Sequence, residues 1–63
     1  MATFVITKID DQVDRVLIYG HPKWDDYHVI APEGTPVKVG DIVEYQPEGY
    51  NFGRFVRIKV SSL

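Results

Sequence analysis

The sequence contains no cysteine, so disulfides, iron–sulfur clusters and thiolate zinc sites are excluded. Its apolar runs, such as Val16–Tyr19, are four residues or fewer, far short of the roughly 20 residues that a membrane-spanning helix needs. The first residues show neither the basic region nor the apolar stretch of a signal peptide. We therefore expect a soluble, cytoplasmic protein that does not enter a membrane.

Residues for common kinds of catalysis are also scarce. No serine precedes Ser61, and a chain without cysteine lacks the other usual nucleophile. The carboxylate pairs Asp10–Asp11 and Asp25–Asp26 are adjacent in sequence, so in extended chain their side chains point apart. His21 and His28 match no zinc-ligand spacing. We expect a non-enzymatic protein with no catalytic residues, no metal and no cofactor.

A basic excess is missing as well. Seven basic and nine acidic residues give a net charge of −2, whereas proteins dedicated to duplex DNA carry a clear positive excess. The charge is unevenly distributed, because residues from Asn51 onward include three basic residues and no acidic one. Any nucleic-acid binding must therefore come from one local face, helped by base stacking.

The length of 63 residues allows one small domain, which we assign to residues 1–63. No stretch shows the apolar periodicity of a helix. Instead, turn residues such as Gly, Pro and Asp separate five β-rich runs. These runs are Thr3–Ile9, Arg15–Tyr19 (beginning as early as Val13), Tyr27–Ala31, Asp41–Gln46 and Phe52–Val60.

Five short strands predict an all-β fold, a five-stranded small barrel, because closure removes the unpaired edges of a flat sheet. The barrel is expected to be OB-like, with an SH3-like barrel as the alternative. The Pro32–Val39 connection has two prolines in eight residues and is too short for a helix. Gly53, inside the last run, is expected at a bulge or a barrel corner.

Alternation along the runs predicts which side chains face the core. Val56, Ile58 and Val60 are expected on one face of the last strand, and Phe55 on the other. The first run is apolar on both faces, as in a strand shared by both halves of a barrel. The predicted core consists of Val5, Ile9, Val16, Ile18, Val29, Val37, Val39, Val43, Val56 and Ile58.

The segment Gly40–Ile58 resembles the last two strands of cold-shock domains and related small OB folds, including S1-like modules. The matching residues, in order, are Gly40, Val43, Glu44, Tyr45, Glu48 and Gly49. The aromatic RNA-binding motifs of cold-shock domains should lie on the second and third strands, where this chain has Val16–Gly20 and Tyr27–Ile30. The resemblance implies a barrel that binds single-stranded nucleic acid.

The residue types on those strands suggest how nucleic acid would be held. Bases stack on exposed aromatic rings, and basic side chains contact phosphates. The candidate residues are Tyr19, Tyr27, His28 and Phe52 for stacking, and Lys38, Arg54, Arg57 and Lys59 for phosphates. The expected function is weak, low-specificity binding of single-stranded RNA or DNA. A competing interpretation is that these aromatics fill or cap the core of the barrel.

A second hypothesis is a protein-interaction module, such as an accessory or inhibitory protein. Trp24 and Tyr50 fall in expected loops, where they could anchor a protein partner. Asp25 and Asp26 would contribute to an acidic rim facing a basic partner. The ordinary interpretation of these carboxylates is a solvated hairpin loop. Under either hypothesis, edge-strand pairing could join two copies into a homo-oligomer.

Overall fold

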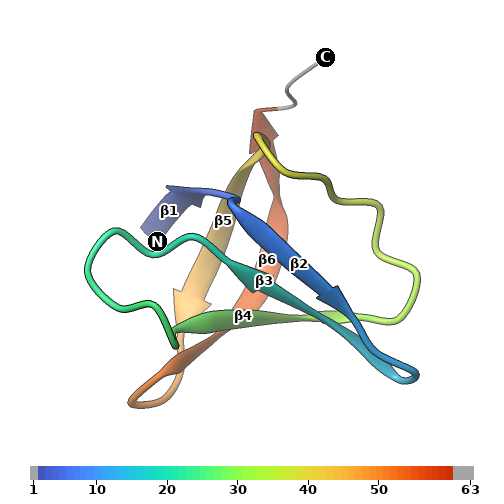
Figure 1. The fold of residues 1–63 in the computed structure, drawn as a ribbon, viewed down its shortest axis with the longest axis horizontal. Coiled ribbons are helices and arrows are strands. Elements are labelled where there is room, and N and C mark those ends of the chain that lie inside the picture. Colours follow the sequence, from blue (N-terminus) through green and yellow to red (C-terminus); the bar gives the residue numbers. More distant parts are fainter. Residues whose placement is uncertain (1, 61–63) are drawn as a thin grey trace.

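The computed structural model describes residues 2–60 and consists of six β-strands joined by turns and loops (Figure 1). The strands are β1 (Ala2–Val5), β2 (Lys8–Asp11), β3 (Arg15–Tyr19), β4 (His28–Pro32), β5 (Ile42–Pro47) and β6 (Phe52–Val60). No helix occurs among these residues, in agreement with the helix-free fold expected from the sequence. The bounds of β6 match the predicted run, and those of β3 match its shorter form.

The first β run forms two strands rather than one. β1 pairs antiparallel with β5, whereas β2 pairs antiparallel with β3, so the two halves of the run lie at opposite ends of the sheet. Between them, the Ile6 N–H donates to the Asp41 carbonyl at 2.9 Å, and the Thr7 N–H donates to the Tyr19 carbonyl at 2.8 Å. The prediction of five strands is therefore wrong by one, because this run changes its pairing partner midway.

The strands form one curled sheet in the order β1-β5-β6-β4-β3-β2. All neighbours are antiparallel except β4 and β6, which pair in parallel. Figure 1 shows β5 and β6 running steeply across the direction of β3 and β4, so the sheet bends around its inner face. The hydrogen bonds at Ile6 and Thr7 link its two ends. The fold is an all-β half-barrel, which confirms the predicted class and supports a small barrel.

The core lies inside the curl and is only partly the predicted one. Val16, Ile18, Val29 and Val43 are buried as expected, whereas Ile9, Val37 and Ile58 are partly buried. Val5, Val39 and Val56 are exposed, which corrects the prediction. Their places are taken by residues that the predicted core omits: Phe4, Ile6, Tyr27, Ala31 and Tyr45. Val5 points outward because Phe4 and Ile6, on the opposite face of the same extended segment, are the residues that enter the core.

Two register shifts in the β5–β6 pair explain why Val56 is not in the core. Tyr45 lies opposite Phe55 but Glu44 lies opposite Arg57, so Val56 is an extra residue in β6. Lys59 is extra in the same way, between Ile58 and Val60. Each bulge reverses the alternation of the residues that follow. Phe55 and Ile58 therefore both pack against the core, which corrects the predicted face of Val56, Ile58 and Val60.

Gly53 has a different role from the predicted bulge, because no register shift occurs at this residue. It lies between Val29 of β4 and Pro47 of β5 and is buried. A Cβ atom there would lie 2.8 Å from the Tyr27 hydroxyl, 2.9 Å from Cδ2 of Tyr45 and 3.0 Å from the Gln46 carbonyl oxygen. Glycine is thus required by the close approach of three strands and the Tyr27 ring.

Candidate nucleic-acid interface

One row of side chains crosses four neighbouring strands on the outer face of the sheet. In the strand register, Lys8 lies opposite Tyr19, Tyr19 opposite His28, and His28 opposite Phe52. The residues adjacent to these rings in sequence, Ile18 on β3, Val29 on β4 and Gly53 on β6, are buried. Alternation therefore directs Tyr19, His28 and Phe52 outward. These three rings are called the aromatic strip below.

The rings of the aromatic strip lie close enough to form one surface. The ring centres of Tyr19 and His28 are 5.8 Å apart, and those of His28 and Phe52 are 6.5 Å apart with planes within 25°. The Lys8 Nζ lies 5.3 Å from the centre of the Tyr19 ring, within cation–π range. The strip therefore has a cation at its β2 end.

Backbone contacts fix the centre of the strip. The His28 Nδ1 contacts the Asp26 carbonyl at 3.1 Å, and because a carbonyl only accepts, this requires a proton on Nδ1. The His28 N–H donates to the Asn51 carbonyl at 3.1 Å, which joins the β3–β4 loop to the β5–β6 turn. The imidazole is therefore held in one orientation between Tyr19 and Phe52.

A second outward row lies beside the strip. Leu17 is opposite Ile30, and Ile30 is opposite Arg54. Leu17 and Ile30 are half-buried, whereas Arg54 is exposed. Arg54 is two residues from Phe52 on β6 and shares its outward face. The outer face thus carries the aromatic strip, two aliphatic side chains, and one cation on each side, Lys8 on β2 and Arg54 on β6.

Three of the four basic residues predicted to contact phosphates lie away from the aromatic strip. Arg57 is five residues from Phe52, about 16 Å along an extended strand, and Lys59 is further still. Lys38 lies in the connection that leaves β4 at Pro32, the end of that strand opposite His28. Of the predicted cations, only Arg54 lies next to the aromatic strip.

Tyr27 does not join the strip either. It is 4% exposed, and its ring lies in the core, 5.7 Å from that of Tyr45. Burial raises the pKa of the Tyr27 hydroxyl, and the neighbouring Tyr45 raises it further. That hydroxyl has no hydrogen-bond partner among residues 2–60. An interior ring cannot stack on a base, which corrects the sequence-based choice of Tyr27.

Arg57 forms an ion pair away from the aromatic strip, in the β5–β6 part of the sheet. Its Nε donates to Oε1 of Glu44 at 2.7 Å, across the β5–β6 pair. This hydrogen bond, with the nearby positive charges of Arg57 and Lys59, lowers the pKa of the Glu44 carboxyl. The guanidinium is thus already paired with a carboxylate.

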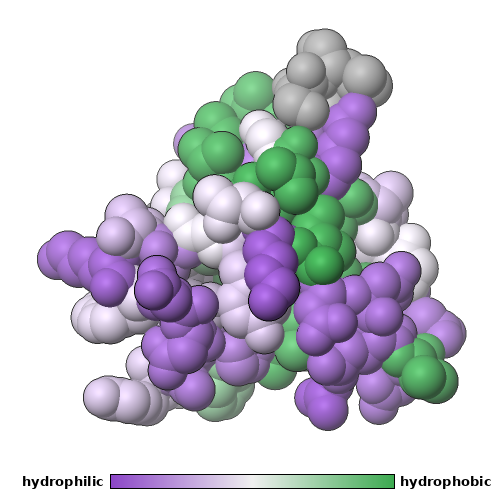
Figure 2. All heavy atoms as spheres, in the orientation of Figure 1, coloured by the Kyte–Doolittle hydropathy of each residue, from purple (hydrophilic) through white to green (hydrophobic). Residues whose placement is uncertain are grey.

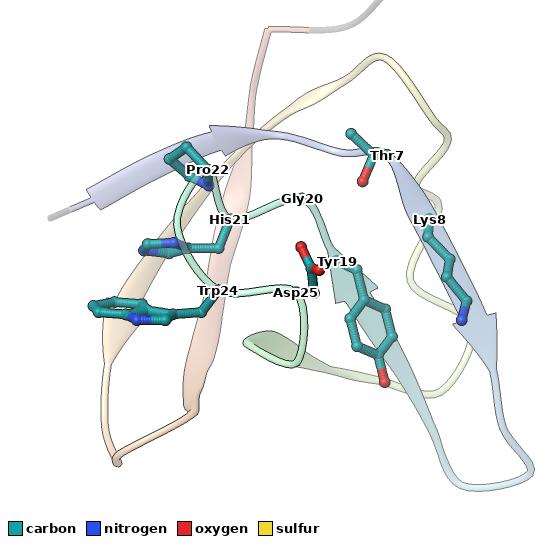
Figure 3. Close-up of a pocket in the computed structure, with 8 residues that line it drawn as sticks. All are labelled: Thr7, Lys8, Tyr19, Gly20, His21, Pro22, Trp24 and Asp25. Carbon is teal, nitrogen blue, oxygen red and sulfur yellow. The ribbon is translucent and has the colours of Figure 1, made fainter.

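The β3–β4 loop carries a second group of rings. His21 and Trp24 are stacked, with centres 4.6 Å apart and planes within 27°, and Figure 3 shows the two rings lying face to face. His21 in turn lies 4.9 Å from the ring of Tyr27. The stack therefore connects the exposed indole to the core.

Two cavities open beside this loop. The larger, about 580 Å³, is the one drawn in Figure 3, and Lys8, Tyr19, Trp24 and Asp25 are among its lining residues. The smaller, about 210 Å³, is lined by Trp24, Asp26, Tyr50 and Asn51. The residues proposed from sequence as a protein-binding set thus gather around these two cavities, next to the aromatic strip.

Polar and apolar surfaces are separated on the face shown in Figure 2. Polar side chains cover most of the lower half, and apolar side chains gather around the upper ends of β5 and β6. Val5, Val39 and Val60 are all more than half exposed. The β2–β3 turn is polar apart from Val13, which is 90% exposed.

Sequence reasoning missed Lys8 and Asn51. Lys8 was missed because the first run was taken as one continuous strand, and the pairing of Lys8 with Tyr19 was therefore not recognised. Counting back from the turn at residues 12–14 as a hairpin would have paired Lys8 with Tyr19. Asn51 contributes through its backbone carbonyl, for which the sequence carries no signal.

Residues 2–60 contain no group of three or more histidine, cysteine or acidic side chains that could hold a metal ion. No helix among them is long and apolar enough to cross a membrane. No family model matches the chain, and neither a curated protein nor a solved structure is similar enough to it to count as a match.

Proposed function

We propose that this chain is a small OB-type barrel that binds single-stranded nucleic acid weakly, with little sequence preference, through the aromatic strip. The parallel β4–β6 pair supports the OB arrangement over the SH3-like one, in which neighbouring strands run antiparallel. If β1 and β2 count as two halves of one strand, the sheet has the five strands of an OB barrel.

The row formed by Lys8, Tyr19, His28 and Phe52 is the observation that carries the proposal. OB barrels bind oligonucleotides on the face of their second and third strands. Those strands correspond here to β3 and β4, and the aromatic strip crosses both. Rings on adjacent strands offer successive stacking platforms, each contributing about 1–3 kcal/mol per base whatever the base.

The charges favour weak rather than tight binding. Lys8 and Arg54 flank the strip and can contact phosphates. Asp25 and Asp26 lie in the adjoining loop and repel them. With a net charge of −2, the protein attracts nucleic acid only locally. Stacking must therefore supply most of the affinity.

The test is an amide-shift titration of labelled protein with hexamers of oligo-U and oligo-dT at low salt. We expect shifts in β3, β4 and the start of β6, centred on the strip, that fade as salt is raised. Tyr19→Ala should weaken binding about tenfold, at the low end of the loss of one stacked base. Tyr50→Ala is the matched control, because Tyr50 is 98% exposed and lies off the strip. An unchanged spectrum at millimolar ligand refutes the function.

A protein partner is the second candidate, favoured by the convergence of Trp24, Tyr50 and Asp26 on one cavity. Trp24 is 54% exposed despite its stack on His21, and an exposed tryptophan in a loop is a typical binding anchor. If a protein is the ligand, Trp24→Ala should cost more than about 2 kcal/mol of binding while the domain stays folded.

A further inference from the structure

The smaller cavity has the composition of a site for one flat, hydrogen-bonding group. Trp24 and Asp26 come from the β3–β4 loop, and Tyr50 and Asn51 come from the β5–β6 turn. Its volume of about 210 Å³ is below the roughly 300–1,000 Å³ of sites for drug-sized ligands. His21 covers one face of the Trp24 indole and is not among the residues that line this cavity. Figure 3 shows the His21 ring stacked on one face of the indole.

The cavity lies at the end of the aromatic strip. Asp26 is two residues before His28 and accepts from its Nδ1 through the backbone carbonyl. Asn51 directly precedes Phe52, and its carbonyl accepts from the His28 N–H. The cavity therefore lies next to the His28 and Phe52 positions of the strip, where a further nucleotide of a bound strand is expected to reach it.

The Asp26 carboxylate is available to a ligand that donates hydrogen bonds. It is exposed, and no hydrogen bond or ion pair to this carboxylate occurs within residues 2–60. Beside a phosphate backbone, an unpaired negative charge is unfavourable unless it is used for recognition. A carboxylate has two acceptor oxygens, and it pairs best with two adjacent donors.

We propose, on the basis of the function proposed above, that this cavity selects a guanine base from the bound strand. Guanine is the one standard base with two adjacent donors, N1–H and the N2 amino group, on its Watson–Crick edge. Adenine and cytosine present one amino group next to an acceptor, and uracil presents one donor between two acceptors. The carboxylate of Asp26 thus matches guanine and leaves an acceptor facing an acceptor with the other bases.

The remaining lining residues suit the same ligand. The exposed rings of Trp24 and Tyr50 provide stacking surfaces for a purine. The Asn51 side-chain amide can donate to the O6 acceptor of guanine. The barrel would then combine low-specificity stacking on the strip with one guanine-selective position.

The experiment compares an oligo-U hexamer with hexamers carrying one terminal G, A or C, by fluorescence polarisation. Wild type should bind the G-containing hexamer about tenfold more tightly, within the range of one bidentate base contact. Asp26→Asn should abolish this preference. Asp25→Asn, which makes the same charge change in the larger cavity, should preserve it. Tyr50→Ala should reduce the preference, because it removes one of the two stacking surfaces of the cavity.

The single tryptophan gives an independent signal, because Trp24 is the only indole in the chain. Its fluorescence should be quenched by the G-containing hexamer and much less by oligo-U. GMP alone should bind far more weakly than the hexamer, because it does not reach the strip. GMP binding as tight as the hexamer would overturn the link to the bound strand.

Failure of this inference differs from failure of the proposed function. Equal affinity for all four hexamers, or a guanine preference that survives Asp26→Asn, overturns the guanine site while leaving strip binding intact. A preference for A or C also overturns it. If no hexamer binds, both the proposed function and the guanine site are refuted.

Discussion

Removing one cation beside the aromatic strip should halve the salt dependence of oligo-U binding. Lys8 lies over the Tyr19 ring, and Arg54 shares the outward face of β6 with Phe52. Each phosphate contact to a single strand contributes about −0.7 to the slope of log K against log salt. Two contacts predict a slope of about −1.4 for wild type and about −0.7 for either Lys8→Ala or Arg54→Ala.

The corresponding affinity changes are modest but measurable. Between about 50 and 200 mM salt, wild type should lose about sevenfold in affinity and each single variant about 2.6-fold. Polarisation titrations at four or more KCl concentrations give the slope directly. Lys38→Ala and Lys59→Ala are matched controls, because each removes an exposed lysine that lies away from the strip.

Two results would refute this reasoning. A wild-type slope near −2.8, reduced by Lys59→Ala or Arg57→Ala, would mean that about four cations contact phosphate and that the strand follows the length of β6. A slope near zero would mean that phosphates are not contacted at all. The second result would leave stacking as the only source of affinity.

Three further predictions concern stability and pH. Gly20→Ala should lower the free energy of unfolding by about 1–3 kcal/mol or more, because φ is 151° and a Cβ would collide with the Val5 carbonyl. Urea unfolding should show a smaller loss for Gly34→Ala, where the space is open, and a change within about 0.5 kcal/mol for Gly20→Ala would contradict the close packing of Gly20 against the segment between β1 and β2. Tyr27→Phe removes a buried hydroxyl without a partner among residues 2–60, so it should leave the free energy of unfolding unchanged or raise it by about 1 kcal/mol. A decrease of about 1 kcal/mol would mean that the hydroxyl is hydrogen-bonded in solution. The lowered pKa of the Glu44 carboxyl gives stability that is present above its usual value of 4.5 and is lost as pH falls through the folded-state pKa. Arg57→Gln should therefore reduce the loss of folding stability at acid pH. The same loss in wild type and variant would rule out a stabilising Glu44–Arg57 ion pair.

The sequence was sufficient for the class of fold and for most strand positions, because turn residues bound the runs after residue 9. It could not reveal the change of partner at Ile6 and Thr7, since the run continues there without Gly or Pro and only tertiary pairing divides it. The bulges at Val56 and Lys59 were hidden for the same reason. Alternation alone therefore assigned Val56 to the wrong face.

The candidate site was partly foreseen. Tyr19 and His28 were expected on neighbouring strands, and the structure places them opposite each other. Tyr27 was misassigned because the sequence-based choice took Tyr27 and the adjacent His28 together as stacking residues. Burial alternates from Tyr27 to Ala31, so Tyr27 shares the inner face with Val29 and its ring meets that of Tyr45 in the core. Lys8 was missed because the first run was taken as one strand, although a hairpin counted back from the β2–β3 turn would have placed Lys8 opposite Tyr19.

The two surfaces that the sequence suggested prove to be neighbours, since Trp24 lines both cavities and Lys8 and Tyr19 line the larger one. A nucleic-acid ligand and a basic protein partner would therefore compete for the same region, and the sign of the Asp25→Asn effect separates them. Asp25 and Lys8 line the same cavity, and charge acts over roughly 8–10 Å at moderate salt. Neutralising it should raise affinity for a polyanion at every base sequence, whereas affinity for a basic protein should fall. Opposite signs from one substitution give a sharper distinction than the size of any single loss.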